Sequence, residues 1–357
     1  MKSFLGINKD ESLIMRGMAI LCIALHNLLH LRNYGFAQEN EVTFSPERYN
    51  YFINHFLNLD HNLVGDIFSF LGWLGVPIFV FLSGYGVSKK YDNYCILSEG
   101  EGKKYIMRSY KKLMLLLLPA ILFLLFNDIA SLNRYGIFTK IFSLSLLTNC
   151  FSLLLNYPVV VYWYLGLTFE LYIIFLVFNK WKSAKLLLWS GLACVLIQGS
   201  LYFIDGSSRL LHYLRDNFIG WLPIFNIGIY YARNSITREW RGKGIIGIAL
   251  AFVCFIILII MNSNYFLWLL MPIMAIPICF IVSSYLIHVP YINKGFIWLG
   301  KYSASIFIVH PLIRMLDFSI LRELNIIILV GAYILMTLVA AYFYEMMYTT
   351  LKAKFLK

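Results

Sequence analysis

Long apolar segments separated by short polar ones dominate the pattern of this chain. A helix that spans the hydrocarbon core of a bilayer needs about 20 mostly apolar residues, and ten segments approach that length. They are residues 12–31, 66–88, 112–130, 159–178, 185–204, 217–232, 244–261, 265–287, 298–317 and 325–347. A shorter apolar stretch, 141–155, is expected to be re-entrant or to lie at the membrane surface. The pattern predicts an all-α, polytopic transmembrane helix bundle of about ten helices.

The composition agrees with this class. The chain is 60% hydrophobic and 13% charged, with a mean hydropathy of +0.73, whereas a soluble domain has about 25% charged residues. The first apolar segment contains Arg16, His26 and His30 and lacks a small-residue cleavage site, so it is expected to be a retained helix and not a signal peptide. We find no Gly/Ser-rich linker and expect a single membrane domain, residues 1–357.

The basic residues predict the orientation of the bundle. With both termini cytoplasmic and ten helices, 22 of the 30 Lys and Arg residues fall on the inner side and 8 on the outer side. This distribution follows the positive-inside rule. The net charge of +12 is therefore accounted for by the inner segments, and no nucleic-acid partner is expected.

The six cysteines are scattered through the chain and form no CxxC pair. Such spacing favours small core residues over a disulfide framework or a metal centre. No metal site is expected.

Four stretches of motif, taken together, resemble the integral-membrane acyltransferase-3 family. They are Arg16-Gly17-Met18-Ala19-Ile20 leading to His26, Gly75-Val-Pro-Ile-Phe-Val-Phe-Leu-Ser-Gly-Tyr85, Trp163-Tyr164-Leu165 through Glu170 and Tyr172, and Leu299-Gly300-Lys301-Tyr302-Ser303 to His310-Pro311. Each stretch alone is weak, since each consists of Gly, Ser and aromatic residues in apolar helices. Their order and spacing across residues 15–311 make the resemblance specific.

The resemblance implies a reaction and its partners. It implies transfer of an acyl group, usually acetyl, from cytosolic acetyl-coenzyme A (acetyl-CoA) to a hydroxyl of a cell-surface polysaccharide or its lipid-linked precursor. It also implies a multi-pass protein of the bacterial plasma membrane, working in the lipid bilayer beside other glycan-assembly proteins. Two alternatives stay open at this point: a transporter or flippase of a lipid-linked sugar, and a catalytically idle relative.

The first helix departs from the family pattern. Where the family has a basic residue, ten residues and then His, this chain has Asn27, and His26 comes one position early. At about 100° per residue, the family spacing returns to within about 20° of the arginine, whereas His26 lies about 80° and His30 about 40° away. The role of the family's first-helix histidine could belong to His26, to His30, or to the His-Asn pair as a subgroup variant. We favour His26.

Three ionisable residues are the candidate catalytic groups: His26, His310 and Glu170. At 1.5 Å per residue, they lie about 16–18 Å deep, near the bilayer midplane. Ionisable groups at that depth normally face a shared cavity, although each alone could be a buried residue hydrogen-bonded between helices. A histidine can take the proton of an acceptor hydroxyl or carry the acyl group itself for one step.

The candidate donor-binding residues follow from the phosphates of coenzyme A, which need fixed cations. Arg16 begins the motif helix, and Arg108 with Lys111 approximates the family's cytosolic Arg-x-x-Arg. Ser83 and Gly84 lie near the same side, where a glycine permits close approach. The alternative is that these Lys and Arg residues only determine the orientation of the helices in the membrane.

Further candidate residues are less closely tied to one role. Asn27 could orient a substrate, and His30 could be an acceptor-side or structural partner. Trp163 and Tyr164 could stack on a sugar or anchor the helix at the interface. Tyr172 and Ser303 belong to the motifs. Glu345, at the inner end of the last helix, is expected to extend its carboxylate toward water.

Overall fold

The computed structural model describes residues 6–30, 43–59, 63–92, 100–130, 134–150, 162–206, 209–234, 245–316 and 326–356. Within these ranges the regular structure is helical and no β-strand occurs. The predicted all-α class is therefore confirmed. The ends of several predicted segments, such as 159–161, lie outside the described residues.

Each of the ten predicted segments contains a helix. In chain order they are α1 (Lys9–His30), α3 with η1 and α4 (Leu63–Leu71, Gly72–Leu74 and Gly75–Tyr91), α5 (Glu101–Ala130), α8 (Trp163–Trp181), α9 (Ala184–Ile204), α11 (Phe218–Arg233), α12 (Ile245–Met261), α13 (Tyr265–Leu286), α14 with α15 (Ile292–Lys301 and Ser303–Arg314) and α17 (Ile326–Phe355). The shorter α2 (Pro46–Leu57), α6 (Arg134–Ser143) and α10 (Arg209–Asp216) lie between them.

Fewer helices are clearly long and apolar enough to cross a membrane. Among the described residues six qualify, and the bent pair α14–α15 makes a possible seventh. The protein is thus a polytopic helical bundle. The crossings by α8, α11 and α12, and the side on which the termini lie, stay predictions.

Two predicted segments differ from the structure. The single helix expected over 298–317 is wrong, because α14 and α15 meet at an angle of 79°. The break lets α14 lie along α1 while α15 packs against α5 and α17. Helix α5 begins at Glu101, well before residue 112, because the intervening Lys, Arg and Glu residues are good helix formers although they are not apolar. Of the stretch 141–155, only residues up to 150 are described: 141–143 are the last residues of α6, and 144–150 follow it.

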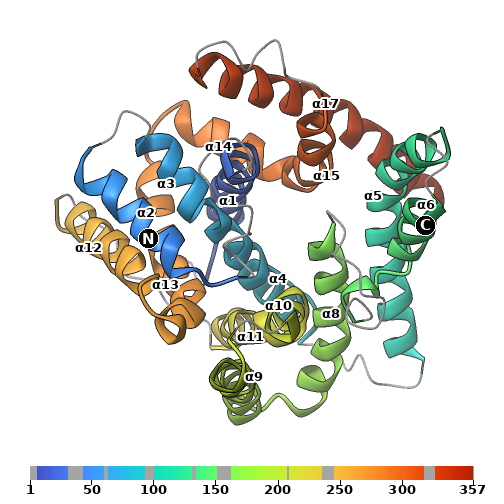
Figure 1. Ribbon diagram of the computed structural model, residues 1–357. Helices are drawn as coiled ribbons and strands as arrows, with labels where there is room; N and C mark the ends of the chain where they lie inside the picture. Colours follow the sequence, from blue (N-terminus) through green and yellow to red (C-terminus); the bar gives the residue numbers. More distant parts are fainter. Residues whose placement is uncertain are drawn as a thin grey trace.

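Helix α1 lies near the middle of the bundle, with α3, α4, α14 and α15 around it (Figure 1). Its approach to α14 requires a glycine: a Cβ on Gly300 would lie 1.9 Å from the carbonyl oxygen of Leu13. The central position places both Arg16 and His26 inside protein and away from lipid.

Helices α4 and α11 cross through a reciprocal glycine contact. A Cβ on Gly84 would lie 2.2 Å from the carbonyl oxygen of Phe225, and a Cβ on Gly228 would lie 2.2 Å from that of Phe81. Small residues that let backbones approach closely are typical of membrane helix pairs. The structure therefore gives Gly84 a packing role.

We expect Gly84→Ala to lower the free energy of unfolding by about 1–3 kcal/mol, the usual cost of overpacking. Gly86→Ala is the matched control, because nothing lies within 4 Å of its added Cβ and it lies on the same helix. Thermal unfolding of the two purified variants in detergent measures the difference. Equal stability of both variants would contradict the reciprocal contact.

Candidate active site

A cavity of about 430 Å³ lies between α1, α4, α5, α8, α14, α15 and α17. Its volume is typical of a small-molecule site. Six cations from five helices line it: Arg16, Lys90, Arg108, Lys112, Lys301 and Lys352. Among the described lining residues, Glu345 is the single carboxylate. The cavity therefore carries a strong positive field that suits a polyanionic ligand.

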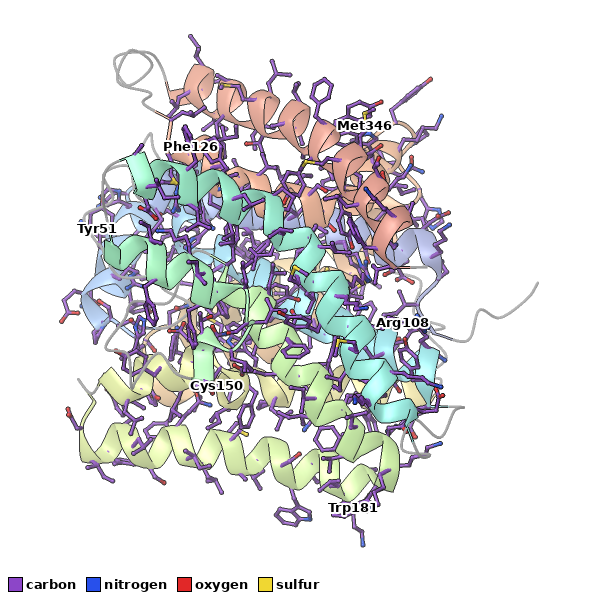
Figure 2. The ribbon with its side chains drawn as sticks, turned by 90° about the vertical axis from the view of Figure 1, so that its right-hand side faces the viewer. Tyr51, Arg108, Phe126, Cys150, Trp181 and Met346 are labelled. Atoms are coloured by element: carbon purple, nitrogen blue, oxygen red, sulfur yellow. The ribbon has the colours of Figure 1, made fainter. Side chains whose placement is uncertain are left out.

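The cations gather at one end of the bundle. Figure 2 shows Arg108 on the side of the molecule opposite Tyr51 and Phe126. The sequence predicts the Arg108 end to be cytoplasmic, because the basic residues concentrate there. On α5, Arg108 and Lys112 are four residues apart and so share a helix face.

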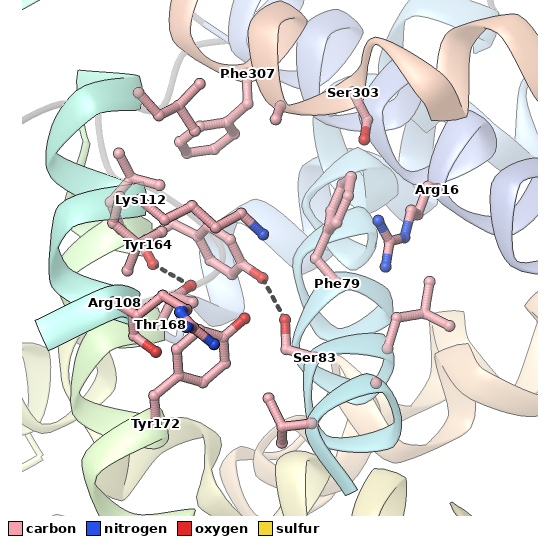
Figure 3. A pocket seen from close by; sticks show the side chains of 18 of the residues that line it. Arg16, Phe79, Ser83, Arg108, Lys112, Tyr164, Thr168, Tyr172, Ser303 and Phe307 are labelled. Atoms are coloured by element: carbon pink, nitrogen blue, oxygen red, sulfur yellow. Dashed lines mark hydrogen bonds between the residues drawn. The ribbon is translucent and has the colours of Figure 1, made fainter. Parts of the chain in front are cut away.

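Polar and aromatic side chains line the same cavity (Figure 3). The Ser83 Oγ lies 3.5 Å from the Tyr164 hydroxyl, and the Thr168 hydroxyl donates to the Tyr164 carbonyl oxygen at 2.8 Å. The Tyr172 hydroxyl points to the same space. These hydroxyls line the same cavity as the cations and offer hydrogen bonds to polar groups of a bound ligand.

Arg16 has a feature that points to a ligand. Its side chain lines the cavity, and its Nε is buried with no hydrogen-bond partner in the part of the chain that the structure describes. A buried donor left unpaired costs about 1–3 kcal/mol. A bound anion could offset that cost.

The predicted donor-binding residues divide into two groups. Arg16, Ser83 and Arg108 line the cavity, whereas Gly84 packs on α11. Lys111 lines a separate groove beside Phe355, which shares Arg108 with the cavity. Tyr164, predicted to stack on a sugar or to anchor the helix, lines the cavity, as do the motif residues Tyr172 and Ser303. Trp163 does not, and its ring packs 5.9 Å from that of Trp221.

His26 and His30 lie outside this cavity. The His26 Nδ1 donates to the Ser69 carbonyl oxygen at 2.9 Å, and the rings of His26 and His30 stack with their centroids 5.2 Å apart. Because Nδ1 carries the proton, Nε2 is the basic nitrogen of neutral His26. Asn27 joins α1 to α15 by accepting a hydrogen bond of 2.8 Å from Arg314 at its Oδ1.

The structure does not bring His26, His310 and Glu170 to one cavity. His310 is buried, and its Nδ1 donates to the Ile306 carbonyl oxygen of its own helix at 3.1 Å. Its ring lies 5.7 Å from that of Phe307, which lines the cavity. The Glu170 carboxylate accepts from the Phe218 backbone N–H at 2.9 Å, and so it fixes the start of α11.

Several lining residues were not predicted as site residues. Glu345 does not merely reach for water, because it accepts a hydrogen bond of 2.6 Å from the fully buried Ser305 and faces the cavity. Glu345 and Lys352 are seven residues apart, which places them on one helix face, and this spacing could have revealed the pair. Lys301 lies inside a motif, but the bend after it is not visible in the sequence.

These features define a polytopic helical membrane protein with a cation-lined cavity at one end. A family model described as an acyltransferase domain, that of the acyltransferase-3 family, matches residues 12–345. The chain therefore belongs to the acyltransferase-3 family and is a membrane acyltransferase. Comparisons with curated proteins and with solved structures gave no match.

Proposed function

We propose that the protein transfers an acetyl group from acetyl-CoA to a hydroxyl of a cell-surface polysaccharide or its lipid-linked precursor. The observation that carries the donor assignment is the convergence of six cations, Arg16 among them, on one cavity. Coenzyme A carries several phosphate charges that such a cavity would neutralise. Family membership favours this reaction over transport of a lipid-linked sugar.

In the proposed reaction, the acceptor oxygen attacks the thioester carbonyl carbon. The new C–O bond forms, the C–S bond breaks, and the electron pair of that bond goes to the departing sulfur. His26 Nε2 takes the hydroxyl proton, and coenzyme A takes a proton at sulfur from the solvent of the cavity. Arg16 and His26 are about 15 Å apart along α1, and the long pantetheine arm separates the phosphates of coenzyme A from its thioester.

The proposal extends to the setting of the reaction. Residues 1–357 act as one domain in a bacterial plasma membrane, with the donor entering from the cytoplasm. The acceptor is a glycan or lipid-linked sugar, and other glycan-assembly proteins supply it. No metal takes part.

Neighbouring lysines on α5 provide the test. Lys112 lines the cavity, whereas Lys111 lines the separate groove. We expect Lys112→Ala to weaken coenzyme A binding about threefold to tenfold, the effect of one charged contact that is partly exposed to water. Lys111→Ala should change it less than about twofold. Calorimetric titration of the purified full-length variants measures both, and equal losses would place the donor elsewhere.

Mass spectrometry of surface glycans from cells with and without the protein tests the acceptor. Loss of acetyl groups at an unchanged amount of glycan supports the proposal. Loss of the glycan itself with unchanged acetylation would support the flippase instead.

A further inference from the structure

A second cluster of ionisable side chains lies at the end of the bundle opposite the cations. Helix α3 packs against α1, and helix α2 packs against α3 (Figure 1); Tyr51 of α2 marks this end in Figure 2. The cluster consists of His26 and His30 on α1, Arg48, Tyr51 and His55 on α2, and Asp66 on α3. The proposed donor site does not use these side chains.

The cluster runs from the interior to the surface. The stacked rings of His26 and His30 are 1% and 6% exposed. Asp66 is 2% exposed, and its Oδ2 accepts a hydrogen bond of 3.0 Å from the Nδ1 of His55. His55 is 22% exposed, and its ring lies 4.1 Å from that of Tyr51. His55 is therefore the member of this ion pair that meets solvent.

A small void connects the two ends of the cluster. It measures about 20 Å³, and most of the residues that line it are polar: His30, Asp66, Arg48, Tyr51 and Ser69. A polar void of this size is large enough for one water molecule. His30 lines the void, and Ser69, which also lines it, accepts a hydrogen bond from His26 through its carbonyl oxygen. Water in the void could hydrogen-bond to His30 and Asp66 together.

We propose that His30, Asp66 and His55 form a proton path that leads from His26 to the outer surface. The path deepens the proposed function and rests on it. When the C–O bond forms, Nε2 of His26 takes the hydroxyl proton, and a bridging water passes a proton on to the stacked ring of His30. Water in the void carries it to Asp66. Asp66 passes a proton across its hydrogen bond to Nδ1 of His55, in the tautomer that bears its ring proton on Nε2, and Nε2 releases a proton to the outer solvent. The thiolate of coenzyme A takes up its proton at the other end. Each transfer then releases one proton outside and consumes one inside.

The test uses purified full-length protein with acetyl-CoA and a glycan extract from cells that lack the protein. Release of the coenzyme A thiol is followed in H₂O and in D₂O. We expect Asp66→Asn to lower turnover about tenfold, less than the loss of a direct general base, and to raise the solvent isotope effect. Acetyl-CoA affinity should be unchanged. His55→Gln should lower turnover, and added imidazole buffer should restore it in proportion to its concentration.

His212→Gln is the matched control, because His212 forms another His–Asp pair, with its Nε2 3.4 Å from the Asp216 carboxylate. It should show neither the isotope effect nor a response to imidazole. The path is overturned if Asp66→Asn turns over within twofold of wild type, or if turnover falls while the isotope effect and the response to imidazole stay at wild-type values. Failure of the wild-type protein to bind acetyl-CoA and to release thiol would reject the proposed function and the path with it.

Discussion

Replacement of His26 by Ala is expected to lower acyl transfer about 10²–10⁴-fold, the usual contribution of a general base. The Nδ1 of His26 is held by the Ser69 carbonyl oxygen, so Nε2 is the nitrogen that can accept a proton. The side chain is 1% exposed and lies outside the cation-lined cavity. Affinity for acetyl-CoA should therefore stay unchanged, and calorimetry with purified protein at matched concentration separates binding from transfer.

His30→Ala is the comparison, because His30 lies one turn further along α1 and stacks on His26. We expect it to reduce transfer about tenfold, because His30 receives the proton only after the base has taken it. If His30→Ala abolished transfer while His26→Ala kept most of it, His30 would be the base. If neither variant lowered transfer, neither histidine would serve the reaction.

Arg16→Ala should weaken acetyl-CoA binding roughly tenfold or more, because a charged hydrogen bond contributes about 1.5–3 kcal/mol. Arg16 lines the cavity, and its Nε is buried with no partner among the described residues. Removal of the guanidinium takes a cation from the anion site and leaves the other five in place. Calorimetric titration of acetyl-CoA into the purified variant measures the loss.

Arg16→Lys is the control, since it keeps the charge but loses the planar fork that binds phosphate through two hydrogen bonds. It should recover part of the affinity. Transfer at saturating acetyl-CoA should stay near that of wild type for both variants. Arg16 binds the donor and takes no part in moving the proton of the acceptor hydroxyl. Unchanged affinity in Arg16→Ala would remove Arg16 from the donor site.

The sequence was informative about helices because lipid selects apolar residues over a fixed thickness. All ten predicted segments contain helix. The length of apolar segments could not predict the bend at Tyr302, because both α14 and α15 are apolar. It also placed the start of α5 too late, because helix continues through residues that meet water and not lipid.

For the site residues, the sequence predicted how deep each residue lies along its helix better than the direction in which its side chain points. Arg16 and Arg108 do line the cavity, but Lys112 lines it in place of its neighbour Lys111. His310 and Glu170 were chosen for depth, yet one binds its own helix and the other binds the start of α11. Such partners depend on how helices rotate against each other, and spacing within one helix does not determine that rotation.

The 79° bend between α14 and α15 has an electrostatic consequence. A helix that ran straight through residue 302 would place no terminus near the cavity. The bend instead begins α15 at Ser303, and both Ser303 and Ala304 line the cavity. The aligned peptide dipoles of a helix place about half a positive charge at its first turn. The first turn of α15 therefore adds a positive partial charge at Ser303 and Ala304, opposed by the negative end of α14 at Lys301. No substitution of a basic side chain would remove this pair of backbone charges.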